Sequence, residues 1–313
     1  MMKHIFITGC PRSGTTMLAS ILGSHASSIV TPESDFFIEF LYKKLKRKTD
    51  SVDISEFLKF LNENYRFKQW KIDANKIGCT SSHVNFENFN SLIENTVSLF
   101  AEKHQKNLNS KINRIDHTPS SIKSFDVLVQ LFPSAKFIFI IRDPRAVYAS
   151  VKDLDWGANT ALKLAEIWNE YVTYYFCLEK LHPEKVLLVK YEDILTNPEL
   201  NVKKLCDFVN IVYNDLMLEG KGFIIPGYTA SQHNLVGKKL DKGRIIKWKK
   251  ELTIDDILVI ESKCKPVMSV FGYEVSQNIN YKIGAKKKVK MLLGEILYYL
   301  KNKMKKKRRE YKA

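Results

Sequence analysis

The sequence of 313 residues has few cysteines, and the five that it has form no recognisable pattern. Their number is odd, their spacing is wide, and no two of them form a C-x-x-C pair. A disulfide framework or a zinc site needs paired cysteines at short, regular spacings. The sequence therefore indicates neither, predicts no metal site, and favours a reducing compartment. The cysteines are Cys10, Cys79, Cys177, Cys206 and Cys264.

Long apolar runs and linkers are also missing. No run approaches the roughly 20 residues that cross a bilayer, and residues 1–8 lack the regions of a secretory signal. No Pro-rich or Gly/Ser-rich segment and no internal repeat divides the chain. A composition with 45% hydrophobic and 27% charged residues excludes a disordered chain. We therefore expect a globular, cytoplasmic protein with one domain over residues 1–280.

Three short apolar runs have the composition of buried strands. They are residues 4–8 (HIFIT), 136–141 (KFIFII) and 186–191 (VLLVKY), and a helical pattern follows over 161–181. Apolar strands that alternate with helices are typical of a parallel sheet covered on both faces. The sequence therefore predicts an α/β fold of three layers, with a mainly helical insertion over 36–112 that shapes part of the site.

A glycine-rich loop connects the first strand to a helix. Gly9 and Gly14 have the spacing of a P-loop, whose backbone N–H groups hold phosphate oxygens at a helix N-terminus. A P-loop for nucleoside triphosphates continues with Lys and Ser or Thr, whereas Thr15 and Thr16 follow here and the loop's cation is Arg12. The loop predicts a site for a doubly charged anion without the usual γ-phosphate contacts. A tight strand-to-helix turn is the alternative.

A second polar segment follows the strand 136–141. Arg142 comes directly after the strand, Asp143 and Pro144 predict a helix start, and Ser150 lies two turns further on. A guanidinium at the carboxyl edge of a strand offers forked donors to a phosphate, and the helix brings the Ser150 hydroxyl beside it. A surface turn with a local ion pair is the alternative.

Together these segments resemble the sulfotransferases that use 3′-phosphoadenosine 5′-phosphosulfate (PAPS). Residues 10–16 read CPRSGTT and are similar to the 5′-phosphosulfate loop of that family, and 132–150 are similar to its 3′-phosphate segment. The stretch 241–249 resembles a late loop that reaches the same phosphate. The resemblance implies a P-loop-like fold, PAPS as donor, and these cofactor-binding residues: Pro11, Arg12, Ser13, Gly14, Thr15, Thr16, Arg142, Ser150, Lys242 and Gly243.

Sulfuryl transfer to a hydroxyl needs a base for the nucleophile and positive groups at the leaving phosphate. Glu33 is the candidate base, since it matches the position of a catalytic Glu in tyrosylprotein sulfotransferases. Asp35 is the second choice, and an ordinary acid at a helix start is the alternative interpretation of Glu33. Arg12 is expected to neutralise the leaving 5′-phosphate.

A histidine takes the place of a lysine that many relatives carry before the second phosphate segment. Residues 116–119 read DHTP, which places His117 where the resemblance implies that Lys. His117 is the expected cationic donor or acid–base group, with activity falling as pH rises through its pKa, and a structural histidine is the alternative. His233, within the loop 226–237, is interpreted as a loop residue.

The last 33 residues are strongly basic. Residues 281–313 hold 11 Lys, 2 Arg and 2 Glu, which gives 11 of the 16 net positive charges. Between Lys286 and Met304 the apolar residues form one stripe of a helix among lysines. A helix docked on the body, a peripheral anchor on an anionic membrane and a nucleic-acid contact are three interpretations. Nucleic acid is the least favoured, because only Tyr298 and Tyr299 add aromatic rings.

The sequence therefore predicts a PAPS-dependent sulfotransferase with adenosine 3′,5′-bisphosphate as product and a hydroxyl or amine as acceptor. A carbohydrate or a lipid-linked glycan is the expected acceptor. Two alternatives remain: a phosphotransferase that uses a nucleoside triphosphate, and a membrane-associated binding protein that acts through the basic tail.

Overall fold

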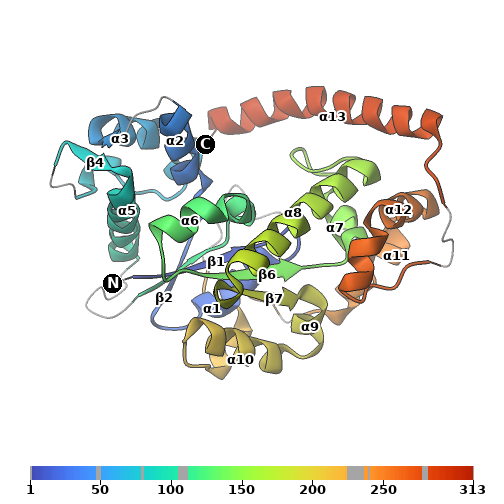
Figure 1. Ribbon diagram of the computed structural model, residues 1–313, viewed down its shortest axis with the longest axis horizontal. Coiled ribbons are helices and arrows are strands. Elements are labelled where there is room, and N and C mark those ends of the chain that lie inside the picture. Colours follow the sequence, from blue (N-terminus) through green and yellow to red (C-terminus); the bar gives the residue numbers. More distant parts are fainter. Residues whose placement is uncertain are drawn as a thin grey trace.

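A five-stranded parallel sheet forms the centre of the computed structural model (Figure 1). The structure describes residues 2–46, 51–78, 81–104, 112–223, 236–238, 240–276 and 281–312. The strand order is β2-β5-β1-β6-β7, and every pairing is parallel. The predicted α/β fold with a central parallel sheet is confirmed. The bounds are β1 (Lys3–Thr8), β2 (Ser28–Thr31), β5 (Asn113–Asp116), β6 (Lys136–Ile141) and β7 (Val186–Lys190).

The strand order decides where a ligand finds room. β1 lies in the middle, with β5 and β2 on one side and β6 and β7 on the other. The register pairs Phe6 with Asp116 of β5 and Thr8 with Phe139 of β6. In open parallel sheets ligands bind beyond the carboxyl ends of the strands, where the chain leaves to opposite sides. The loop that follows β1 lies at this point.

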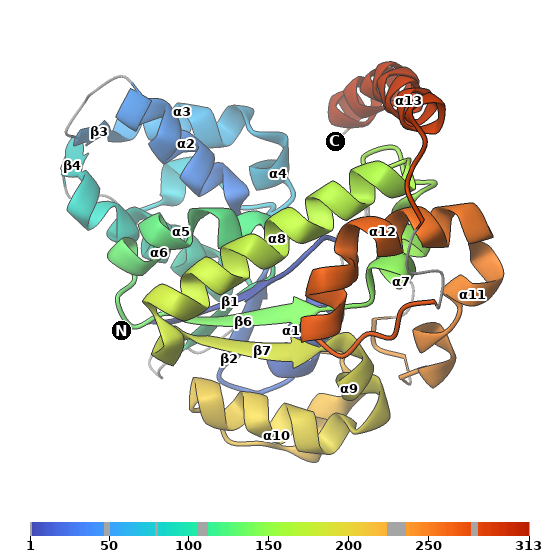
Figure 2. The same ribbon diagram turned by 45° about the vertical axis from the view of Figure 1, so that its right-hand side comes forward.

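Helices cover both faces of the sheet, and Figure 2 shows α8 on one face and α10 on the other. One layer holds α6, α8 and α12, and the opposite layer holds α1, α9 and α10. This arrangement is the predicted three-layer architecture. The bounds are α1 (Thr15–Gly23), α6 (Phe125–Leu131), α8 (Ala161–Leu181), α9 (Tyr191–Thr196), α10 (Pro198–Val209) and α12 (Ile254–Val270).

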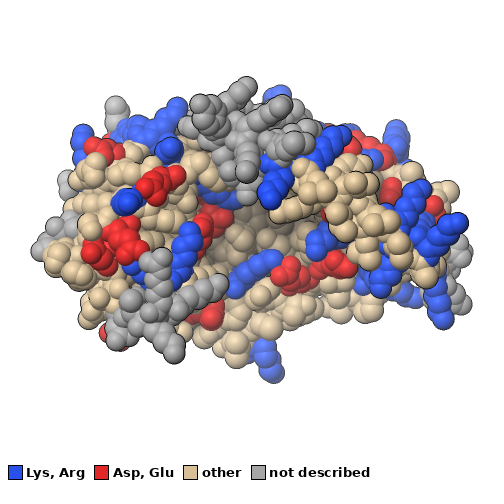
Figure 3. Space-filling view, turned by 90° about the horizontal axis from the view of Figure 1, so that it is seen from above, with Lys and Arg blue, Asp and Glu red and all other residues tan. Residues whose placement is uncertain are grey.

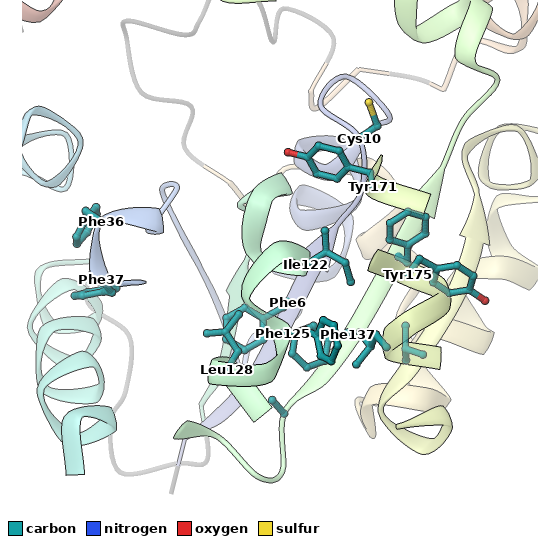
Figure 4. Packing of buried hydrophobic residues seen from close by; sticks show 14 of the residues in the cluster. Phe6, Cys10, Phe36, Phe37, Ile122, Phe125, Leu128, Phe137, Tyr171 and Tyr175 are labelled. Carbon is teal, nitrogen blue, oxygen red and sulfur yellow. The ribbon is translucent and has the colours of Figure 1, made fainter. Parts of the chain in front are cut away.

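The two faces of the sheet have different side chains. Phe6, Phe137 and Phe139 point to the layer of α6 and α8, where the ring centroids of Phe6 and Phe137 lie 5.2 Å apart (Figure 4). Burial of each such side chain stabilises the fold by about 1.5–3 kcal/mol. A sheet with apolar residues on both faces needs both helical layers. The isoleucines between the phenylalanines pack on the opposite face: Ile5, Ile7, Ile138 and Ile140.

The described part of residues 36–112 lies beside the sheet and is mainly helical (Figure 1). Their core is aromatic: the ring of Phe57 lies 5.1 Å from Phe40 and 5.3 Å from Phe89. A short antiparallel pair, β3 and β4, was not expected, because strands of three residues show no alternating pattern. The bounds are α2 (Asp35–Lys46), β3 (Ser51–Asp53), α3 (Ile54–Glu63), α4 (Tyr65–Lys68), β4 (His83–Asn85) and α5 (Phe89–Lys103).

The C-terminal helix α13 (Ala285–Lys312) runs along the outside of the molecule, as the upper part of Figure 1 shows. The amide of Asn302 donates a hydrogen bond of 3.1 Å to Oδ1 of Asn159, which precedes α8. Nearer its start, Nζ of Lys287 lies 2.9 Å from Oδ1 of Asp255 in α12. No helix in the described part of the chain is long and apolar enough to span a membrane.

Candidate active site

The loop between β1 and α1 has, at two positions, a backbone conformation that favours glycine. Gly9 has a φ of 148° and Gly14 a φ of 109°, and both values favour glycine. A Cβ atom at Gly14 would lie 2.7 Å from the ring of Tyr191, so space and backbone both require glycine. The N-terminus of α1 begins directly after Gly14, where its unpaired N–H groups favour a bound anion.

A cavity of about 870 Å³ opens at this loop. Its walls come from the loop, from the turn after β2, from α4, from the segment before α8 and from α13. The face seen in Figure 3 is hollowed near its middle, and Lys and Arg side chains lie around the hollow. The loop residues that line the cavity are Pro11, Arg12, Gly14, Thr15 and Thr16.

Three arginines converge on one side of the cavity. Nε of Arg12 donates to Oγ of Ser150 at 3.2 Å, and Nη1 of Arg142 donates to the carbonyl oxygen of Arg12 at 3.0 Å. Nη2 of Arg142 also reaches the carbonyl oxygen of Arg244 at 3.5 Å. Burial lowers the pKa of Arg12, and the charges of Arg142 and Arg244 lower it further. Positive groups held this close to one another fit a bound dianion.

Arg142 has spare donor capacity for such an anion. Its side chain is 9% exposed, and its Nε has no hydrogen-bond partner among the described residues. The guanidinium carbon lies 4.2 Å from the ring centroid of Tyr191, which fixes the plane of the group. Buried polar groups in proteins are nearly always paired, so this orphaned donor fits a phosphate oxygen.

Most of the predicted cofactor-binding residues lie at the cavity, but three do not. Ser13 is fully buried: its backbone N–H donates to the carbonyl of Cys10 at 3.0 Å, and its hydroxyl has no partner among the described residues. Lys242 and Gly243 are exposed and do not line the cavity. That these three residues bind the cofactor stays a prediction, because no ligand contact of theirs is shown.

Asp241 and Arg244 line the cavity where Lys242 and Gly243 were expected. Residues Lys242–Ile245 form a 3-10 helix, and Oδ1 of Asp241 caps it by accepting from the N–H of Gly243 at 2.8 Å. Residues three apart share one side of a 3-10 helix, so Asp241 and Arg244 face the cavity together while Lys242 points away. The signal in the sequence that could have identified Arg244 as a cavity-lining residue is its position three residues after the capping Asp241.

Acidic residues line another part of the same cavity. Glu33 lies in the turn after β2, Asp35 begins α2, and both belong to the cavity wall. Nη1 of Arg66, from α4, lies 3.2 Å from Oε2 of Glu33 and also pairs with Asp35. Burial raises the pKa of Glu33, Arg66 opposes this shift, and Asp35 adds to it. Burial also raises the pKa of Asp35, again against the opposing effect of Arg66.

Arg66 is a functional candidate that the sequence did not reveal. Burial lowers its pKa, but Asp35 and Glu33 outweigh that effect, and the net shift is upward. Its permanent charge favours the ionised form of Glu33, which is the form that accepts a proton. Arg66 lies 33 residues after Glu33 in the insertion, and no local pattern links the two.

A buried polar network holds the turn that carries Glu33. The N–H of Ser34 donates to Oγ1 of Thr118 at 2.9 Å, and Nη2 of Arg114 donates to Oγ of Ser34 at the same distance. Arg114 also pairs with Oδ2 of Asp116 at 2.7 Å, and both side chains are at most 2% exposed. Glu33 and Asp35, on either side of Ser34, are therefore anchored to β5.

His117 does not reach the cavity. It is 3% exposed, its ring packs at 4.7 Å against Phe223, and it is not among the cavity-lining residues. Burial lowers its pKa to about 4, although Asp116 opposes the shift, so the ring is neutral near pH 7. A buried neutral ring does not fit the expected cationic donor, and an acid–base role of His117 stays a prediction. His233 lies outside the described residues.

The comparisons with known proteins agree with this geometry. The sequence pattern of the sulfotransferase family matches residues 4–215. The chain is 24% identical over 290 residues to the protein-tyrosine sulfotransferase of Drosophila melanogaster, covering 88% of this chain but only 53% of the relative. It is 26% identical over 294 residues to protein-tyrosine sulfotransferase 1 of Danio rerio, covering 88% of this chain and 74% of the relative.

A solved structure shares the fold. The sulfotransferase domain of the olefin synthase from Synechococcus PCC 7002 superposes with a TM-score of 0.55 at 19% identity. The match covers 88% of this chain and 96% of that domain.

Proposed function

The chain belongs to the sulfotransferase family, and on this premise we propose that it transfers the sulfuryl group of PAPS to a hydroxyl or amine acceptor. The convergence of Arg12, Arg142 and Arg244 on one cavity at the end of β1 carries the proposal. The fit is supported by the orphaned Nε of Arg142 and by the glycine cradle at Gly14. When bound, PAPS supplies an activated sulfur whose bond to the 5′-phosphate oxygen breaks during transfer.

Different residues of the chain have different roles in this reaction. Glu33 takes the proton of the acceptor as the acceptor oxygen or nitrogen forms its bond to sulfur. Arg12 and the N–H groups at the start of α1 stabilise the charge that develops on the leaving phosphate. Arg142 and Ser150 hold the 3′-phosphate and so align the donor with the nucleophile. Arg66 keeps the Glu33 carboxylate ionised and oriented.

The expected acceptor is a carbohydrate or lipid-linked glycan hydroxyl. A cavity of about 870 Å³ has room for an acceptor beside the donor, and Tyr65, Trp156 and Tyr171 add aromatic surfaces to its walls. Aromatic rings stack on the apolar faces of sugars, while carboxylates accept from sugar hydroxyls. The relatives named for tyrosine are 23–26% identical to the chain, and such identity does not decide the acceptor.

The test of the donor is a thermal-shift titration with adenosine 3′,5′-bisphosphate beside ADP and ATP, each with and without magnesium. A ligand that binds only the folded state stabilises by RT ln(1 + [L]/Kd). We expect strong stabilisation by the bisphosphate that does not depend on magnesium. Stabilisation by Mg-ATP alone would overturn the proposal and favour a phosphotransferase.

The acceptor is then found with labelled PAPS. Free glycans, lipid-linked sugars and tyrosine peptides are offered in parallel, and label transfer is measured for each. Transfer to a sugar class but not to the peptides is the expected result. Transfer to the peptides alone would contradict a carbohydrate acceptor and leave the donor assignment intact.

A further inference from the structure

The face of α13 that points away from the body is apolar. Six of its side chains are 46–68% exposed, although all are of types that normally pack in a core. At 3.6 residues per turn they form one continuous stripe along the helix. The residues of this outer stripe are Val289, Leu292, Leu293, Ile296, Leu297 and Leu300.

The contacts of α13 with the body use the opposite face. Lys287 pairs with Asp255, Met291 packs on the main core, and Asn302 bonds to Asn159. A Cβ atom at Gly294 would lie 3.7 Å from the Thr160 side chain. These positions are four, three and eight residues apart, so they share one face of the helix and leave the outer stripe in solvent. A helix that was simply docked on its own body would bury its apolar stripe instead.

Exposed lysines flank the outer stripe on both sides. On a helical projection Lys290 and Lys301 lie along one edge, and Lys288 lies along the other. Lysines in this position extend to anionic groups while their methylene stems lie on the apolar surface. An apolar stripe between two rows of lysine is typical of helices that lie in the headgroup layer of a membrane.

We propose that α13 binds the surface of an anionic membrane through its outer stripe and the flanking lysines. The charge of the helix favours this partner over a second copy of the chain, because pairing two stripes would bring the flanking lysines of both helices together. It also favours a membrane over nucleic acid, which would leave the leucines in water. Binding does not require the helix to cross the bilayer.

The cavity then lies at the membrane surface. Tyr299, Asn302 and Lys303 of α13 line it, so a membrane-bound α13 places the cavity beside the headgroup layer. This step rests on the proposed function: it selects, among hydroxyl acceptors, those that are presented on a lipid.

The test is co-sedimentation of the full chain with vesicles of phosphatidylcholine, alone and with phosphatidylglycerol added. We expect binding to the anionic vesicles that weakens as salt is raised, and little binding to the neutral ones. The double variant Leu293→Glu/Leu297→Glu is expected to reduce partitioning by about tenfold or more, because it places charge in the stripe. The matched control is Leu200→Glu/Leu216→Glu, since Leu200 and Leu216 are 56% and 63% exposed on the body.

Several outcomes would overturn the proposal. These are no binding of the unmodified chain to anionic vesicles, or equal binding by the two double variants. A dimer in sedimentation velocity that only Leu293→Glu/Leu297→Glu dissociates would assign the stripe to a second copy. Oligonucleotide binding with no vesicle binding would assign the helix to nucleic acid.

The vesicle assay is independent of the proposed reaction. It contains no donor and no acceptor, so it succeeds or fails whether or not the chain transfers sulfate. Each variant is first shown to be folded by its unfolding temperature without ligand. Bisphosphate titration of the same samples then tests the donor site alone.

Discussion

The cavity has two walls of opposite character. The arginine wall is formed by Arg12, Arg142 and Arg244, and burial together with the charges of Arg142 and Arg244 lowers the pKa of Arg12. The acid wall pairs two carboxyl groups, Glu33 and Asp35, with the one guanidinium of Arg66, so it carries charges of both signs. A wall with several close arginines suits a permanent anion, while a wall that pairs carboxyl groups with a guanidinium suits a group that gains and loses a proton. The difference assigns donor binding to the arginine wall and acceptor activation to the acid wall. Variants of each wall test this division.

The largest effect is expected on the acid wall. Replacement Glu33→Gln removes the base and should lower kcat by about 10²–10⁴-fold, without changing the stabilisation by adenosine 3′,5′-bisphosphate. Steady-state kinetics and thermal shift measure the two quantities. Glu39→Gln, which removes an exposed carboxylate paired with Lys43 on the same helix as Asp35, is the control. An unchanged kcat in Glu33→Gln would move the base elsewhere, with Asp35→Asn as the next variant.

On the arginine wall the effect is expected on binding. Arg142→Ala should weaken the bisphosphate by about 100-fold or more, since two charge-assisted hydrogen bonds are lost. Arg142→Lys keeps the charge but not the forked pair of donors. Its affinity for the bisphosphate should lie between those of Arg142→Ala and the unmodified protein. Isothermal titration calorimetry measures the affinities. Equal loss of affinity in Glu33→Gln would show that the two walls do not act separately.

The two walls also differ in how well the sequence predicts them. Arg12 and Arg142 follow strands, and Ser150 lies two turns into the helix that begins at Pro144. The carboxyl ends of parallel strands meet at one edge, so the sequence places these residues together. Arg66 reaches Glu33 from an insertion whose path depends on aromatic packing between distant residues. The sequence places His117 where many relatives carry a lysine, but its burial against Phe223 depends on tertiary packing. Strand and helix patterns therefore predict the sheet and the loop, not which polar groups meet across the cavity.

A smaller effect is expected for Arg66, and it concerns the pH dependence of kcat. Arg66→Ala removes the charge that opposes the upward pKa shift of Glu33, so the pKa should rise further. The base must be ionised, and the acid limb of kcat against pH should therefore move to higher pH by about one unit. At neutral pH we expect a loss of up to about tenfold, with most activity retained in Arg66→Lys. A uniform loss with an unmoved acid limb would assign Arg66 to acceptor binding alone.

The smallest effect concerns stability and comes from two buried histidines outside the cavity. Burial lowers the pKa of His4 and of His117 to about 4, against 6.5 in the unfolded chain. The unfolded chain therefore binds protons that the folded chain does not, and the free energy of unfolding falls as pH drops from about 6.5 to about 4. Each histidine accounts for about 2 kcal/mol of this loss at pH 5.

His117→Gln should remove the part of this acid sensitivity that belongs to His117. Urea unfolding at pH 7.5 and pH 5 measures the difference, and the exposed His83→Gln is the control. If His117→Gln and His83→Gln lost the same stability on acidification, a buried neutral His117 would be contradicted.

The backbone of Arg12 links folding to the reaction in a different way. Its φ of 73° is left-handed, which costs a residue other than glycine about 1–2 kcal/mol. Arg12→Gly should therefore raise the unfolding temperature while it removes the guanidinium from the phosphate. The backbone of Arg12 therefore costs stability, while its guanidinium serves the proposed transfer. The loop is thus a place where stability and activity oppose each other, and thermostable variants chosen without an activity screen are expected to lose their function there first.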